Sequence, residues 1–172
     1  SISGDEQGGQ LVDGRGTTLA RFRVDGDKLR ITAADGVAVG TVFGYQQRYK
    51  IKDAQDRELF EFQAQSDGDW KLKDADEKFV YRIKRRDYGF ELEDPADVSL
   101  CKVKLKEGKT SLRDSAEETI FSTKDQISTV AVVPLGFAVV ESLPMRCGMM
   151  FAIASRLGQG SADNVKAERE TQ

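Results

Sequence analysis

The sequence predicts a mainly β protein: a closed antiparallel barrel of roughly twelve strands around one buried hydrophobic helix near the C-terminal end. Three observations predict this fold. A hairpin unit returns about every twenty residues, each unit alternates apolar with charged side chains, and one apolar segment of helical length follows the last unit. The chain has 172 residues, which suits one domain with a substantial core better than two.

The repeat is clearest in the apolar residue that stands two positions before each predicted turn. These residues follow one another at intervals of 20, 21, 20 and 20 positions: Ile31, Ile51, Leu72, Leu92 and Leu112. Four of them are followed two positions later by an aspartate: Asp53, Asp74, Asp94 and Asp114. An aspartate that opens a tight turn can accept a hydrogen bond from the backbone N–H two residues on. Each unit is therefore predicted to be a β-hairpin.

The alternation inside each unit is that of a strand with one buried and one wet face. Leu72 stands between Lys71 and Lys73, and the same pattern continues along the returning strand 79–84. Further strands are predicted upstream over 18–24, 28–33 and 37–44, and downstream over 118–124, 128–133 and 136–142. A single sheet of that length with one wet face is expected to curl and close.

The apolar segment 143–157 is predicted to be a helix, with Ser142 as N-cap, Pro144 in the first turn and Gly158 as C-cap. Apolar residues surround almost its whole circumference, so the helix should be buried. At about 1.5 Å per residue it is roughly 21 Å long, too short for a bilayer but suited to the middle of a barrel. The domain is predicted over 17–158, between a flexible polar leader (1–16) and a polar tail (159–172).

Composition excludes several classes of chemistry. The chain has no histidine, so Ser-His-Asp, Cys-His and histidine-based zinc sites are impossible. Its two cysteines, Cys101 and Cys147, form no CxxC motif, and two buried thiols are favoured over one disulfide. A net charge of -3 argues against binding of nucleic acid. We therefore expect a non-enzymatic protein with no catalytic residue, cofactor or metal; the acidic segments 67–70 and 74–77 are explained by turn chemistry rather than by calcium.

Three segments carry a resemblance to a known family. RYKIKDAQDRELFEF (48–62), WKLKDADEKFVYRIKRR (70–86) and LPMRCGMMFAIASRL (143–157) resemble the hairpins and terminal helix of the tubby-like superfamily, which includes plant LURP-one-related proteins, phospholipid scramblases and tubby. The resemblance spans about residues 17–157. It implies a closed twelve-stranded barrel around a central helix, phosphoinositide binding by surface Lys and Arg as in tubby, and membrane association as in scramblases. Neither tubby's headgroup-binding residues nor the scramblase calcium segment can be matched here, so no residue role is carried over.

The candidate site is a cationic patch on the outer face of the predicted sheet. It comprises Lys71, Lys73, Arg82, Lys84, Arg85, Arg86, Lys102 and Lys104. Such a patch could hold phosphate groups or an anionic membrane surface, although lysines on a wet strand face also keep a sheet soluble. Arg146 and Arg156 lie on the apolar helix and need partners, either strand-end carbonyls or water at the barrel mouths, or a ligand carboxylate or phosphate.

The leading hypothesis is a binding module for anionic phospholipid or a membrane surface, with a protein partner as another possibility. The second is a structural or interaction protein without a ligand, in one version an envelope lipoprotein tethered through residues 1–10. The third is a lipid carrier, which an internal helix argues against because it fills the cavity. A cytoplasmic or peripheral membrane location is expected unless a signal segment precedes Ser1, in which case an anchored lipoprotein is expected.

Overall fold

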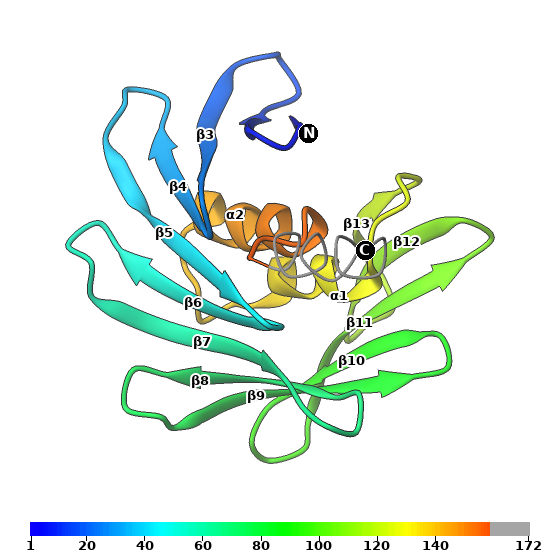
Figure 1. The fold of residues 1–172 in the computed structure, drawn as a ribbon. Coiled ribbons are helices and arrows are strands. Elements are labelled where there is room, and N and C mark those ends of the chain that lie inside the picture. The colour runs from blue at the N-terminus through cyan, green and yellow to red at the C-terminus, as the bar shows by residue number, and fades with distance from the viewer. Residues whose placement is uncertain (159–172) are drawn as a thin grey trace, which may run out of the picture.

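The computed structural model describes residues 1–158, and the predicted tail 159–172 lies outside them. Its main feature is one sheet of 13 antiparallel strands in which strands pair in chain order (Figure 1). The strands are β1 (Ile2–Gly4), β2 (Gly8–Val12), β3 (Thr18–Asp25), β4 (Lys28–Ala33), β5 (Ala38–Tyr45), β6 (Arg48–Asp53), β7 (Glu58–Ala64), β8 (Trp70–Asp74), β9 (Phe79–Arg86), β10 (Gly89–Glu93), β11 (Ser99–Lys106), β12 (Lys109–Asp114) and β13 (Thr119–Thr123). The mainly β prediction is confirmed.

The sheet is open, where the sequence predicted a closed barrel of about twelve strands. Within residues 1–158, β1 pairs with β2 alone and β13 with β12 alone, so two edges face each other across a seam. The physical reason lies just after β13, because the segments 128–133 and 136–142, predicted to supply further strands, do not form strands. The chain turns into the concave side of the sheet and fills it instead (Figure 1).

Three short helices occupy that interior: α1 (Thr129–Val132), η1 (Val133–Gly136) and α2 (Leu143–Ala154). The run of valines favoured a strand, but Pro134 has no N–H to give to a ladder and stands in the first turn of η1, where that loss costs nothing. The predicted N-cap of α2 is confirmed, since Ser142 Oγ accepts a hydrogen bond from Met145 N at 3.2 Å. The helix ends earlier than predicted, at Ala154, and Gly158 lies beyond it.

The predicted aspartate turns are present in four successive hairpins. Each aspartate Oδ1 accepts hydrogen bonds from the backbone N–H groups two and four residues on, all at 2.9 Å: Asp53, Asp74, Asp94 and Asp114. The residue three positions after each aspartate has a left-handed backbone, with φ between 62° and 64°. The turn chemistry inferred from the repeat is therefore the chemistry that reverses the chain.

The segment 1–16, predicted to be a flexible leader, contains β1 and β2 instead. Its glycines allow this packing, because a Cβ added to Gly4 or Gly9 would lie 2.7 or 2.9 Å from a ring carbon of Phe151 on α2. Leu11 on β2 is buried in the core. A Gly-rich polar composition is typical of a tail, but here it permits close approach of backbone to an aromatic ring.

The core lies between the concave face of the sheet and α2. Phe62, fully buried, contacts Trp70 and Phe137 with ring centroids 4.7 and 5.4 Å apart. Tyr81 stacks on Phe137 at 5.4 Å, and its hydroxyl accepts a hydrogen bond from Val139 N at 3.2 Å. The segment between η1 and α2 is thereby fixed to the sheet. Within residues 1–158, no helix has both the length and the apolar character needed to cross a bilayer.

Candidate functional site

Seven of the eight predicted cations lie on the outer face of the sheet, because each alternates with buried core residues along its strand. Lys71 and Lys73 lie on β8, Arg82, Lys84 and Arg86 on β9, and Lys102 and Lys104 on β11. The register places Lys71 opposite Arg82, and places Glu91 between Lys84 and Lys102. The structure therefore brings these seven onto neighbouring strands of one convex surface.

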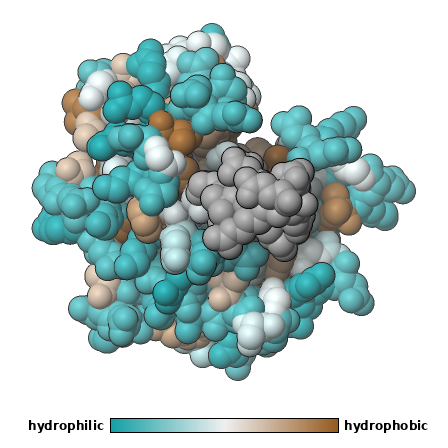
Figure 2. Space-filling model, in the orientation of Figure 1, coloured by the Kyte–Doolittle hydropathy of each residue, from teal (hydrophilic) through white to brown (hydrophobic). Residues whose placement is uncertain are grey.

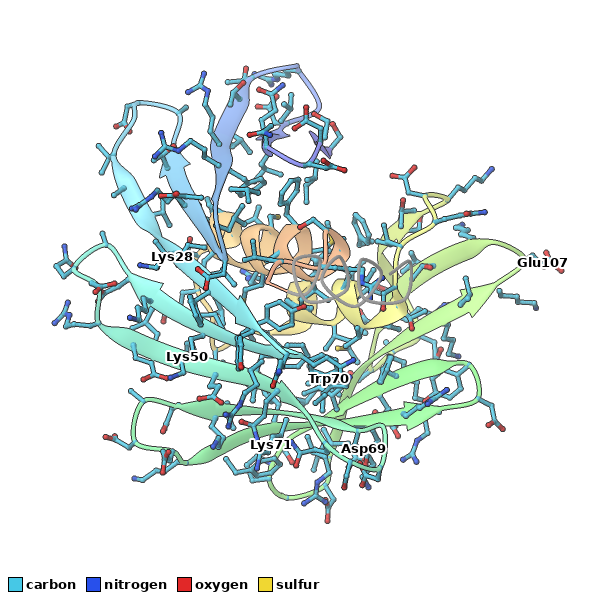
Figure 3. All side chains as sticks on the ribbon, in the orientation of Figure 1. Lys28, Lys50, Asp69, Trp70, Lys71 and Glu107 are labelled. Carbon is cyan, nitrogen blue, oxygen red and sulfur yellow. The ribbon has the colours of Figure 1, made fainter. Side chains whose placement is uncertain are left out.

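Arg85 does not belong to that surface. Arg85 comes two residues after Ile83, so its side chain lies on the same face of β9 as the buried side chain of Ile83. It stands opposite Phe90 on β10. With Trp70 it lines a cavity of about 490 Å³ at the end of the strands. Its backbone N–H donates to Asp69 Oδ1 at 2.9 Å, and Figure 3 labels Asp69 and Trp70 at this end of the sheet. The three adjacent basic residues Lys84, Arg85 and Arg86 thus lie on two faces of the strand.

Carboxylates accompany most of the outward cations. Five of the seven have a carboxylate oxygen within 4.0 Å: Arg82–Asp97 at 3.5 Å, Lys84–Glu93 at 3.1 Å, Arg86–Glu91 at 2.9 Å, Lys102–Glu117 at 3.5 Å and Lys104–Glu117 at 3.1 Å. A hydrogen bond from Lys104 holds the pKa of Glu117 below its ordinary value. The predicted patch is therefore a network of ion pairs, and an incoming phosphate would have to compete with its carboxylates.

A second set of outward lysines has no such partners. Lys28 on β4, Lys50 on β6 and Lys73 on β8 lie on one line across the sheet, which we call the lysine row. Among residues 1–158, none of the three has a carboxylate oxygen within 4.0 Å. Phe43 stands between Lys28 and Lys50, and Glu61 stands between Lys50 and Lys73.

The positive charge of the lysine row is not cancelled by its one acidic residue, and a further unpaired lysine lies beside it. Glu61, its one acidic member, is engaged by Arg48, whose Nε lies 3.1 Å from Glu61 Oε1. Lys71, next to the row on β8, also has no carboxylate within 4.0 Å in the described part of the chain. Figure 3 labels Lys28, Lys50 and Lys71 on β4, β6 and β8, and Figure 2 shows how hydrophilic the outer surface is. The lysine row and Lys71 thus form one area of the outer face whose lysines have no carboxylate within 4.0 Å among residues 1–158.

The other notable feature is a groove along the seam between the two sheet edges. This seam groove is a cavity of about 580 Å³, lined by residues of β1, β13 and α2. Its lining is mainly apolar and includes Ile2, Leu11, Ile120, Phe121, Leu143 and Met150. Two large apolar side chains stay exposed at its border, Ile120 at 60% and Leu143 at 47%. An apolar surface of this kind is typical of a site that is covered by a ligand or partner.

Arg146 is the basic side chain in the lining of the seam groove. Its terminal nitrogens donate to Leu135 O and Glu141 O, both at 3.4 Å, the long limit for such bonds. Its Nε is buried without a hydrogen-bond partner. No carboxylate of residues 1–158 lies within 4.0 Å of it. Arg146 was predicted to use carbonyls at strand ends, but the two carbonyls that it uses belong to η1 and to the segment before α2, and most of its donor capacity stays unused.

The remaining reactive groups are buried thiols. Cys101 and Cys147 are both free, as expected, and burial raises their pKa to about 12 and about 11. A thiol in that state packs as an apolar group and is a poor nucleophile. Residues 1–158 contain no group of three or more Cys, Asp or Glu side chains arranged to hold a metal ion.

These features define a mainly β protein: an open, thirteen-stranded antiparallel sheet wrapped around short helices, with a cationic row outside and an apolar groove at its seam. No protein-family model matches the chain, and no curated protein sequence matches it. One solved structure with some similarity is the X-ray structure of an Arabidopsis thaliana protein. It has 14% sequence identity and a TM-score of 0.43, over 59% of this chain and 68% of that chain.

Proposed function

We propose that the protein is a non-enzymatic binding module that engages anionic lipid headgroups at a membrane surface through the lysine row. The observation that carries this proposal is the line Lys28, Lys50 and Lys73, three cations on alternate strands without carboxylate partners. The predicted patch around Arg82 and Lys104 is the weaker candidate, because its cations are already paired.

A lysine without a carboxylate partner gains more from an anionic bilayer than a paired lysine does. A lysine near an anionic bilayer contributes about 1 kcal/mol, so the row would contribute about 3 kcal/mol. A paired lysine such as Lys84 gains less, since its carboxylate partner is repelled by the same surface. Neighbouring strands lie about 4.8 Å apart, which puts successive lysines of the row about 10 Å from one another. Phe43, half-buried between two of them, adds an apolar ring of the kind that interfacial segments bury at the boundary between headgroups and acyl chains.

The relation to the tubby-like superfamily is part of the same proposal. Repeated hairpins around an interior C-terminal helix support it, and the open seam departs from the closed barrel that the family pattern implies. A cytoplasmic or peripheral membrane location fits this function, and an envelope-anchored lipoprotein is the alternative. The competing hypothesis of a structural protein without a lipid ligand is decided by the following experiment.

The test is flotation of the full chain with vesicles of phosphatidylcholine alone or with about 30% phosphatidylserine. One triple variant changes the row: Lys28→Gln, Lys50→Gln and Lys73→Gln. The control triple variant, Lys78→Gln, Lys106→Gln and Lys109→Gln, removes the same number of charges from exposed positions elsewhere. The row variant should lose binding to anionic vesicles by about 100-fold, equivalent to 3 kcal/mol, while the control should lose far less.

Two results would count against the proposal. Equal loss in both variants would show that total charge, not the row, governs adsorption. Indifference of the wild-type protein to lipid charge and to salt between 0.05 and 0.5 M, chosen to span about 14 to 4 Å of screening length, would favour a structural protein.

A further inference from the structure

We infer that the seam groove is a second binding site, independent of the lysine row, for a single-chain amphiphile with a carboxylate head, such as a fatty acid. The apolar lining would hold the hydrocarbon chain and Arg146 would hold the carboxylate. The inference stands on the unused donors of Arg146, on the cavity between the sheet edges and on the exposed apolar residues at its border.

Arg146 indicates that the head group of the ligand is an anion with hydrogen-bond acceptors. A guanidinium has five N–H donors, and Arg146 uses two of them, both in long bonds to carbonyls. A half-buried cation among apolar residues, with no carboxylate of the described chain near it, lacks a counter-ion. A carboxylate matches the fork geometry of a guanidinium and would supply both charge and acceptors.

The apolar side of the seam groove indicates that the ligand has a hydrocarbon tail. The cavity volume of about 580 Å³ lies within the range of about 300–1,000 Å³ that is usual for small-molecule sites. Met150, Phe151 and Ala154 of α2 form one wall, and apolar residues of β1, β2 and β13 form others. Binding would remove from water part of the exposed surface of Ile120 and Leu143.

A hydrocarbon chain suits the groove better than an added peptide strand. β1 has three residues and β13 has five, so each edge of the seam offers only a short ladder to a new strand. The lining is mainly apolar, and it reaches Cys147 and Leu135 inside the sheet. Such walls recognise an apolar chain and give few backbone partners to a peptide.

One acidic side chain, Asp125, also lines the groove, and it is exposed. Water and salt screen an exposed charge more strongly than a half-buried one, so Arg146 should dominate recognition. Asp125→Asn should therefore tighten binding of a carboxylate by a small factor, about twofold. A loss of binding in this variant would contradict the assignment of the charges.

The test is calorimetric titration of the full chain with twelve-carbon ligands that differ in the head: dodecanoate, dodecanol and dodecylammonium, all below their micellar concentrations. Acetate supplies the same head without the tail. Dodecanoate should bind at least about tenfold more tightly than dodecanol, as a charge-assisted hydrogen bond implies, and acetate should not bind measurably. Equal affinity for the three heads would overturn the role of Arg146, and no binding of any would overturn the site.

Two variants separate the head from the tail. Arg146→Gln should lower the affinity for dodecanoate by about tenfold and leave dodecanol unchanged. Ala154→Leu places a larger side chain in the groove and should weaken both ligands. Arg23→Gln, on the outer part of β3, is the matched control and should change neither. Because none of these residues belongs to the lysine row, the vesicle assay can fail while this one succeeds, and the reverse.

The three methionines provide a readout that does not depend on variants. Met150 lines the groove, whereas Met145 and Met149 do not. With methyl-labelled methionine, dodecanoate should shift the NMR signal of the Met150 methyl group and leave the other two nearly unchanged. Uniform shifts of all three would indicate a general rearrangement or binding elsewhere, and would refute the groove as the site.

Discussion

The contact between Gly148 on α2 and Ile31 on β4 leads to a sharp test of the interior helix. A Cβ added to Gly148 would lie 2.2 Å from Ile31 Cδ1 and 2.9 Å from Ile31 Cγ1. Ile31 is 1% exposed, so its side chain has little room to move away. The variant Gly148→Ala should therefore force the helix away from the sheet or push Ile31 into a poor rotamer.

The magnitude follows from two opposing terms. Overpacking of a core costs about 1–3 kcal/mol, while replacing glycine by alanine inside a helix gains about 1 kcal/mol. Gly148→Ala alone should thus cost between about 0 and 2 kcal/mol. Ile31→Val removes Cδ1 and alone should cost about 0.5–1.5 kcal/mol. In the Ile31→Val background the alanine no longer meets Cδ1 and only the 2.9 Å approach to Cγ1 remains, so most of its packing cost should be lost.

The measurement is a double-mutant cycle by urea unfolding. The two substitutions should couple favourably by about 1–3 kcal/mol, because the second relieves the clash of the first. Gly148→Ala combined with Val42→Ala, a similar core truncation on β5, is the control and should be nearly additive. Additivity of the Gly148 and Ile31 pair within about 0.5 kcal/mol would refute the packing of α2 against β4.

Three further results are expected. Asp94→Ala removes the acceptor of two backbone hydrogen bonds of 2.9 Å and should lower the free energy of unfolding by about 1–2 kcal/mol, measured by urea unfolding. Cys101 and Cys147 should be alkylated very slowly at pH 8, since burial raises their pKa to about 12 and about 11, and rapidly in urea, as mass spectrometry would show. Stability should fall as pH drops through 4.5 and below, because hydrogen bonds from backbone Arg57 and from side-chain Lys104 hold the pKa values of Asp53 and Glu117 below their ordinary 3.8 and 4.5.

Each of these has its own control. Asp97→Asn, three residues beyond Asp94, removes a charge from the same turn and keeps a side chain that tolerates the left-handed backbone there. It should cost less, since no backbone N–H group of residues 1–158 is bonded to the Asp97 carboxylate. Rapid alkylation of either thiol in the native protein would show that the core around α2 is open. In the acid range, Asp53→Asn should flatten the pH dependence, because folded-state carboxylates with depressed pKa stabilise the protein only while ionised; an unchanged profile would assign the effect to other groups.

The hairpins were predictable because their signals are local. Leu72, Asp74 and the alternating lysines beside them lie within a few residues of one another, and the turn bonds of Asp74 depend on nothing distant. The N-cap at Ser142 is local in the same sense. Such features follow from backbone geometry and side-chain period, and the structure confirms them.

The misassigned segments depend on tertiary contacts. Gly4 and Gly9 are suited to strands here only because Phe151 packs on them. The valines before Pro134 are helical because they are buried on all sides, which removes the alternation that a strand with one wet face would show. Closure of the sheet would require β1 and β13, which are far apart in the sequence, to pair with each other. No local sequence pattern indicates whether they do.

The residues of the candidate site and the face on which they lie were predictable, but their ion pairs were not. The sequence placed Lys71 and Lys73 on the outer face, and they are there. It could not show that Glu117 would meet Lys104, because their distance depends on the register between β11 and the turn after β12. The alternation of Lys28 and Lys50 with apolar residues is visible in the sequence. That the two lysines lie on one line, without carboxylate partners, depends on the register of β4, β5 and β6.

Because the strands pair in strict chain order, the number of strands in this sheet can change without altering the order of the others. Duplicating or deleting one hairpin adds or removes two neighbouring strands and leaves the order of all the others intact. At about 4.8 Å between strands, one such event changes the arc of the sheet by about 10 Å while the interior helices stay the same. The distance between the two edges is therefore set by the number of repeats, and relatives with one hairpin more or fewer would differ first in how widely that opening admits a guest molecule.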